Sequence, residues 1–119
     1  MATTLVVWGV IAHLIADWPL QSRWMAENKT SLRHPAGWVH GGIHFLAMLL
    51  VFPPVVAAIL ALSHILIDTR ILFNWWLKVY LKTDEETPIF QHVAIWFDQV
   101  IHVICIAAAA LIVDRFLGG

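Results

Sequence analysis

The sequence predicts an all-α protein, a single integral membrane domain that spans residues 1–119 and forms a bundle of about four transmembrane helices. Three observations predict this class. Hydrophobic residues make up 61% of the chain and charged residues only 13%, whereas roughly 25% of a soluble domain is charged. The apolar residues come in long blocks, more than the core of one small soluble domain can absorb. The blocks also carry pairs of polar residues four positions apart, which is a helical spacing.

The first predicted helix spans residues 5–18 and needs a few flanking residues to reach the ~20 that a span requires. Pro19 should end or kink it, because proline lacks a backbone N–H and disfavours helical geometry in the residue before it. Residues 21–35 form a polar loop, with a surface helix expected around residues 23–29.

The second predicted helix spans residues 36–52 and ends at the tight turn Pro53-Pro54. The third runs from residue 55 through residue 68. It is expected to continue to Tyr80 as an interfacial stretch, because this segment is rich in the aromatic and basic side chains that favour lipid headgroups.

The fourth predicted helix begins at an acidic segment and extends to about Leu117. Asp84 or Thr87 suits its N-cap, because a side-chain oxygen there can accept a hydrogen bond from the first helical turn. Pro88 suits the first turn, where a missing N–H costs nothing.

The distribution of basic residues predicts the orientation in the membrane. Six of the seven Lys and Arg residues fall in the first and third loops, so the positive-inside rule places both termini away from the cytoplasm. Membrane lipid is the expected partner, and further copies of the same chain, in a homo-oligomer, are a second expected partner. A net charge of −1 offers no basic field, which excludes nucleic acid. The six basic residues in the first and third loops are Arg23, Lys29, Arg33, Arg70, Lys78 and Lys82.

Each predicted helix carries two metal-binding types of side chain four positions apart. Positions i and i+4 share one helix face, with Cβ atoms ~5–6 Å apart, so two such side chains can bind one ion or two adjacent ions. Zinc enzymes with an HExxH motif use the same spacing. The pairs are His13 and Asp17, His40 and His44, His64 and Asp68, and Asp98 and His102.

The predicted topology places all four pairs in the cytoplasmic leaflet, where they can meet. A carboxylate at membrane depth costs ~2.5–3.5 kcal/mol, so Asp17, Asp68 and Asp98 need a compensating charge. One or two divalent cations would provide it. Histidine together with carboxylate suits zinc, iron or manganese better than calcium. We therefore expect the eight paired residues to be metal ligands near the cytoplasmic face.

Other interpretations of the same residues stay open. A non-catalytic membrane subunit could use them as a hydrogen-bonded polar core, and a transporter or carrier could use them to move protons or metal. An oxygen-activating diiron site is a third alternative. His34 and His92 are expected outside any site, whereas Gln21, Gln91 and Gln99 could orient the imidazoles.

The strings that contain these pairs resemble a known family. They are HLIAD from residue 13, HGGIH from residue 40, SHILID from residue 63 and DQVIH from residue 98. Together they resemble a widespread bacterial membrane family catalogued as a domain of unknown function, over nearly the whole chain. The resemblance implies a compact multi-pass protein of the bacterial inner membrane. A looser similarity is to membrane-bound metal-dependent hydrolases.

The preferred interpretation is a membrane metalloprotein that acts as a metal-dependent hydrolase. A water activated by the metal would attack an ester or phosphoester presented by lipid or at the interface. Asp17, Asp68 and Asp98 would serve as ligands or as general bases, and the sequence does not separate those roles.

Overall fold

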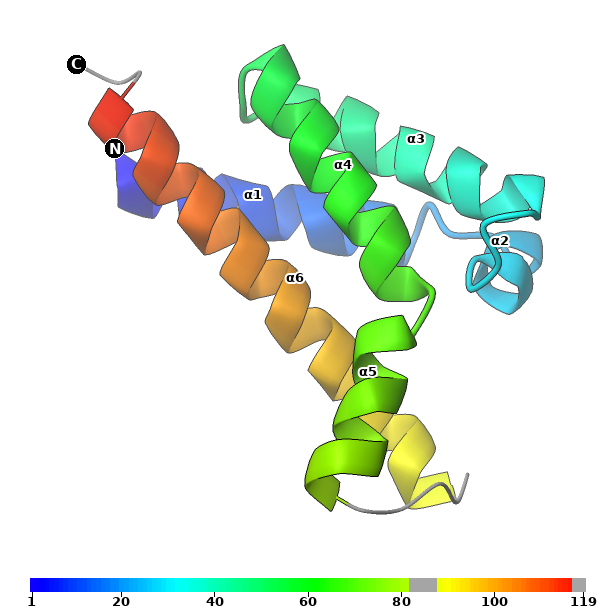
Figure 1. Ribbon diagram of the computed structural model, residues 1–119. Coiled ribbons are helices and arrows are strands. Elements are labelled where there is room, and N and C mark those ends of the chain that lie inside the picture. The colour runs from blue at the N-terminus through cyan, green and yellow to red at the C-terminus, as the bar shows by residue number, and fades with distance from the viewer. Residues whose placement is uncertain (82–87, 117–119) are drawn as a thin grey trace.

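The computed structural model describes residues 1–81 and 88–116, and this part of the chain is helical with no strand, which confirms the all-α prediction. The described residues form four longer helices and two short ones (Figure 1). They are α1 (Ala2–Asp17), α2 (Arg23–Asn28), α3 (Pro35–Leu49), α4 (Pro54–Asp68), α5 (Ile71–Trp76), a π-helical turn (Leu77–Leu81) and α6 (Pro88–Phe116).

The four longer helices form a closed ring of contacts. α1 packs against α3 and α6, and α4 packs against the same two helices. α2 lies against α3, whereas α5 contacts α4 and α6. The start of α1 and the end of α6 lie at the same end of the bundle, away from α2 and α5 (Figure 1).

Prolines mark the ends of several helices, although α3 and α4 each begin one residue before the predicted start, at the proline itself. α1 ends at Asp17, two residues before Pro19, and a turn follows. Pro35 occupies the first turn of α3, where the His34 Nδ1 atom accepts a hydrogen bond from the backbone N–H of Ala36 at 3.0 Å. Pro54 likewise begins α4. Proline is tolerated at these positions because its missing N–H would have no helical partner there.

The third predicted helix does not continue straight to Tyr80. It breaks at Thr69 and Arg70, and the two halves, Pro54–Asp68 and Ile71–Tyr80, meet at 49°. Arg70 has a φ of 62°, which is left-handed and cannot propagate an α-helix. Asp84 and Thr87, the expected N-cap residues of the last helix, lie outside the described residues.

An apolar layer fills the bundle beside the two chain ends, and the predicted polar pairs lie in the adjacent layer. Met48 and Phe52 of α3, Leu60 of α4 and Ile106 of α6 belong to the apolar layer. Next to it, α3 and α4 approach closely at Gly41, where a Cβ would lie 2.3 Å from the Ile65 Cδ1 atom.

This close approach predicts opposite effects for two neighbouring glycines. Gly41→Ala should destabilise the protein by about 1–3 kcal/mol, because the added methyl overpacks the contact with Ile65. Gly42 has open space around its Cβ position, so Gly42→Ala should stabilise the helix by about 0.5–1 kcal/mol. Thermal unfolding in detergent measures both. Equal midpoints for the two variants would contradict this packing.

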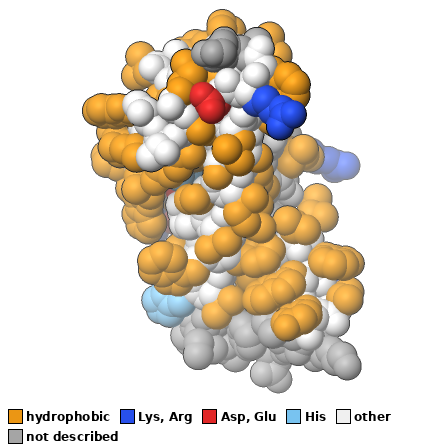
Figure 2. Space-filling model, turned by 90° about the vertical axis from the view of Figure 1, so that its left-hand side faces the viewer, with side chains coloured by type: hydrophobic (Ala, Val, Ile, Leu, Met, Phe, Trp, Pro, Cys, Tyr) orange, Lys and Arg blue, Asp and Glu red, His pale blue; other side chains and the backbone are white. Residues whose placement is uncertain are grey.

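Among the described residues, one helix is long and apolar enough by itself to cross a membrane, the part of α6 from His92 to Phe116. Only 17% of its most apolar window is buried, which is unlike a core helix of a soluble protein. Hydrophobic side chains also gather along the face drawn in Figure 2, where acidic and basic ones lie toward the upper end. α1 has 16 residues and is therefore about 24 Å long, which is shorter than the ~30 Å thickness of the hydrocarbon core of a bilayer. The bundle of four spans therefore stays a prediction.

Candidate metal centre

The structure brings the four predicted pairs into one buried cluster between α1, α3, α4 and α6. Two sets of its side chains each have ligand atoms within 4.8 Å of one another. The first set draws on three helices and the second on two, and His64 belongs to both. The sets are Asp17, His40, His44 and His64, and His64, Asp68 and His102.

The spacing in the first set suits a tetrahedral ion. The Nε2 atom of His40 lies 3.1 Å from Asp17 Oδ1 and 2.9 Å from His64 Nε2. The same Asp17 oxygen lies 3.7 Å from His44 Nε2 and 3.9 Å from His64 Nε2. Ligands bonded at ~2.0–2.1 Å around a tetrahedral zinc are about 3.3–3.4 Å apart, which falls within this range.

Asp68 lies between the two sets. Its Oδ2 atom is 2.9 Å from His64 Nε2 and 3.5 Å from His40 Nε2, whereas its Oδ1 atom is 3.5 Å from His102 Nε2. The two oxygens of one carboxylate thus face different groups of histidines. This is the arrangement that a carboxylate bridging two adjacent ions requires.

Several buried polar atoms of the cluster have no hydrogen-bond partner among the described residues. His44 Nε2 and Asp68 Oδ2 are two of them, although Asp68 Oδ2 lies within ion-pair distance of His64 Nε2. An unsatisfied buried polar group costs about 1–3 kcal/mol, so native proteins seldom keep two side by side. The imidazoles are also crowded, because the His64 ring stacks on His44 at 3.5 Å and on His102 at 4.1 Å between centroids. A bound cation would satisfy both atoms.

His13 and Asp98 join the cluster but lie outside both sets. His13 is 2% exposed, and its Nε2 atom lies 3.0 Å from Gln99 Oε1 and 4.0 Å from Asp17 Oδ2. Asp98 Oδ1 lies 3.2 Å from His102 Nε2, and its side chain keeps 20% of its exposure. The structure therefore brings all eight predicted residues together without giving them equal positions.

Two of the glutamines expected to orient the site touch Asp17. Gln99 donates from Nε2 to Asp17 Oδ2 at 2.7 Å while its Oε1 atom meets His13, so this amide holds a carboxylate and an imidazole in place. Gln21 donates to the Asp17 backbone oxygen at 3.0 Å. The side chain of Gln91 lies outside the described residues. His34 caps α3 and His92 is exposed, both away from the cluster.

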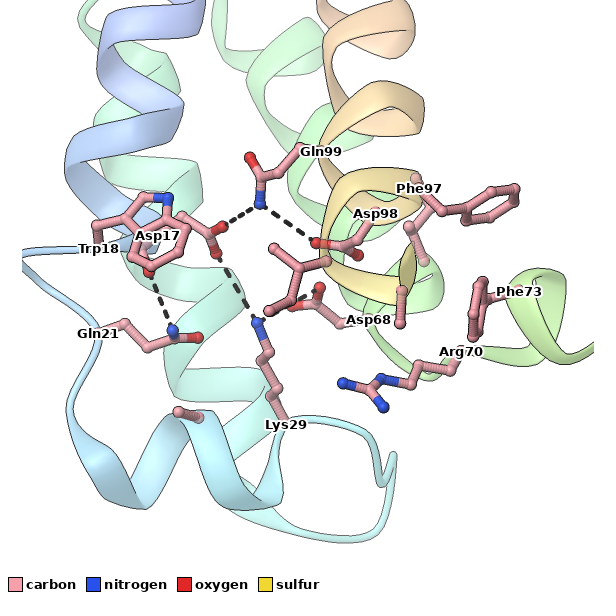
Figure 3. A pocket seen from close by; sticks show the side chains of 14 residues that line it. Asp17, Trp18, Gln21, Lys29, Asp68, Arg70, Phe73, Phe97, Asp98 and Gln99 are labelled. Carbon is pink, nitrogen blue, oxygen red and sulfur yellow. Dashed lines mark hydrogen bonds and ion pairs between the residues drawn. The ribbon is translucent and has the colours of Figure 1, made fainter. Parts of the chain in front are cut away.

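A cavity of about 230 Å³ lies against the carboxylate side of the cluster (Figure 3). Asp17, Asp68, Asp98 and Gln99 line it, whereas none of the five clustered histidines does. The imidazoles therefore face the interior and the carboxylates face the cavity. A small molecule in this cavity would approach an ion held here from the carboxylate side.

Lys29 also lies at the cluster, which the sequence does not predict, because its position in a polar loop indicates only a solvated cation. Its Nζ atom lies 3.9 Å from Asp17 Oδ1 and 3.8 Å from Asp68 Oδ1, and its side chain is 18% exposed. The turn after Pro19 leads into α2, which the Ser22 side chain caps, and this helix packs against α3. The short connection between α1 and α2 is the one sequence feature that could have indicated this position of Lys29.

Comparisons with known proteins identify a family. No curated protein and no solved structure matches the chain. The model of the family described as "Protein of unknown function (DUF3307)" matches residues 5–116, which confirms the resemblance carried by the four histidine and aspartate strings. The looser similarity to metal-dependent hydrolases receives no support from these comparisons. With nearly its whole length matched, the chain belongs to the DUF3307 family.

Proposed function

We propose that the protein is a multi-pass membrane metalloenzyme that hydrolyses an ester or phosphoester at a His/Asp centre. The observation that carries this proposal is the first ligand set, in which four buried donor atoms from three helices converge at spacings that suit one tetrahedral ion. Zinc, iron and manganese are the candidate metals, because imidazole and carboxylate ligands together favour them.

The geometry favours a centre with two ions. Asp17, His40, His44 and His64, the first set, would hold one ion. His102 and Asp68 would hold the second, since the two Asp68 oxygens face the two groups of histidines. His64 is placed with the first ion only, because its Nε2 atom, as a neutral imidazole nitrogen, offers one lone pair.

The three carboxylates would then have separate roles. Asp17 and Asp68 are 3% exposed and belong to the ligand sets. Asp98 lies outside both sets, lines the cavity and keeps some exposure. A metal held here would supply the Lewis acidity that activates a water for hydrolysis. Asp98 would be placed to accept the proton of that water and to return it to the leaving oxygen.

Several features support a four-span topology in the bacterial inner membrane with both termini outside the cytoplasm. α1 begins and α6 ends at one end of the bundle, and α2 and α5 lie away from that end (Figure 1). Lys29 at the end of α2 and Arg70 at the start of α5 line the cavity. In a Cys105→Ala background, Arg33→Cys should react with an impermeant maleimide only in inverted vesicles. Thr3→Cys should react only in intact spheroplasts. Labelling of both from one side would refute this topology.

Metal analysis of the purified protein tests the proposed function. Protein prepared in detergent without chelator should contain one or two equivalents of one transition metal. Removing that metal should abolish hydrolysis of a fluorogenic ester or phosphoester, and adding it back should restore the activity. Protein that neither retains nor takes up zinc, iron or manganese would favour the polar-core or proton-pathway interpretation. Metal uptake into liposomes without hydrolysis would favour a transporter.

A further inference from the structure

We propose that the cavity beside the cluster binds a phosphate group, held by Lys29 and Arg70, so that the substrate is a phosphate ester. This inference rests on the proposed function, because the ion would lie next to the bound phosphate. The two cations line the same cavity and come from different parts of the chain, one from the end of α2 and one from the break between α4 and α5 (Figure 3).

Lys29 has donor capacity to spare. Its ammonium carries three N–H donors, and its two carboxylate partners lie at 3.8 and 3.9 Å, beyond the 2.7–3.2 Å of typical N–H···O hydrogen bonds. The ammonium is therefore attracted to Asp17 and Asp68 without being committed to either. It can donate to an anion in the cavity while it stays between the carboxylates.

Arg70 is held in an unfavourable backbone conformation at the mouth of this cavity. A left-handed conformation costs a residue other than glycine roughly 1–2 kcal/mol, and such strain concentrates at functional sites. The break that it makes turns the chain beneath Asp68 and directs the guanidinium across the cavity toward Lys29 (Figure 3). A guanidinium can bind two phosphate oxygens at once.

The charges around the cavity make phosphate binding depend on metal. Asp17, Asp68 and Asp98 outnumber the two cations by one, so an anion alone would be repelled. One divalent ion reverses the sign of the site, and two make it strongly positive. Because binding linkage is reciprocal, phosphate should in turn tighten the binding of the metal.

The size and the remaining lining also suit a phosphate ester. Pockets for drug-sized ligands hold about 300–1,000 Å³, so a cavity of about 230 Å³ fits a small head group. Apolar side chains such as Ile67, Phe73 and Phe97 complete the lining. They would contact the carbon part of the ester while the phosphate faces the cations.

Equilibrium dialysis with radiolabelled inorganic phosphate tests the inference on protein whose metal content has been measured. Metal-loaded protein should retain phosphate, and protein stripped of metal should not. Lys29→Met and Arg70→Asn should each weaken retention about tenfold or more, because each removes a charged donor. Asparagine tolerates the left-handed conformation, so Arg70→Asn removes the charge without adding strain. Arg33→Asn, the matched control outside the cavity, should leave retention unchanged.

Competition separates the two sources of a phosphate ester. Displacement of the label by phosphatidic acid in nanodiscs, but not by glycerol 3-phosphate, would identify a lipid head group. The reverse would identify a soluble ester, and both results support the phosphate site. Metal-loaded protein that retains no phosphate, or an Arg70→Asn variant that matches Arg33→Asn, would overturn the inference and leave the metal centre standing. Absence of bound metal would instead defeat the proposed function.

Discussion

Replacing His40 and His44 together by alanine should remove the bound metal and reduce hydrolysis to background. These side chains supply two of the four donors of the first ligand set, and both are buried at 1% exposure or less. The two donors left, Asp17 and His64, cannot complete a tetrahedral shell. Elemental analysis and a turnover assay on the same preparation measure the loss.

The matched control for this variant removes two histidines that lie outside the cluster. His34 and His92 have the same chemistry, so His34→Ala with His92→Ala tests whether histidine content alone matters. This control should keep the metal content and the turnover of the original protein, apart from a modest loss of stability from the lost cap of α3. If both double variants kept their metal, the ligand assignment would be wrong.

Replacing Asp98 by asparagine should lower kcat by about 10²–10⁴-fold while the metal content stays unchanged. Asp98 lines the cavity but lies outside both ligand sets, so its loss removes a proton acceptor and not a ligand. Asp17→Asn should behave differently. It replaces a charged donor of the first set, so metal and turnover should fall together.

Asp114→Asn is the control for Asp98→Asn. Asp114 lies on the same helix, α6, at the end away from the cavity, and should tolerate the change with normal turnover. Loss of metal from Asp98→Asn would make Asp98 a ligand instead of a base. Full turnover with full metal content would leave Asp98 without a catalytic role.

Much of the local structure follows from the sequence because its causes are local. Proline cannot donate a backbone hydrogen bond, and it marks the end of α1 and the starts of α3, α4 and α6. The spacing of four residues places the members of each predicted pair on one helix face. In one pair, His64 Nε2 lies 2.9 Å from Asp68 Oδ2. These features require no knowledge of neighbouring helices.

The break at Arg70 could not be predicted in the same way. A left-handed arginine is unfavourable in isolation, so no local preference indicates it, and only the packing of α5 against α4 and α6 holds it in place. Lys29 is a similar case. A lysine in a polar loop is ordinarily solvated, and only the packing of α2 against α3 brings its ammonium near two buried carboxylates.

The sequence by itself determined the helical class, the helix boundaries near prolines and the eight residues that meet in the cluster. Only the tertiary structure decided how those residues divide. It placed Asp17 with histidines of α3 and α4, Asp68 between two groups, and His13 and Asp98 outside both. The physical reason is that helical periodicity fixes which side chains share a face. The packing of four helices in a ring decides which faces meet and which side of the cluster faces a cavity.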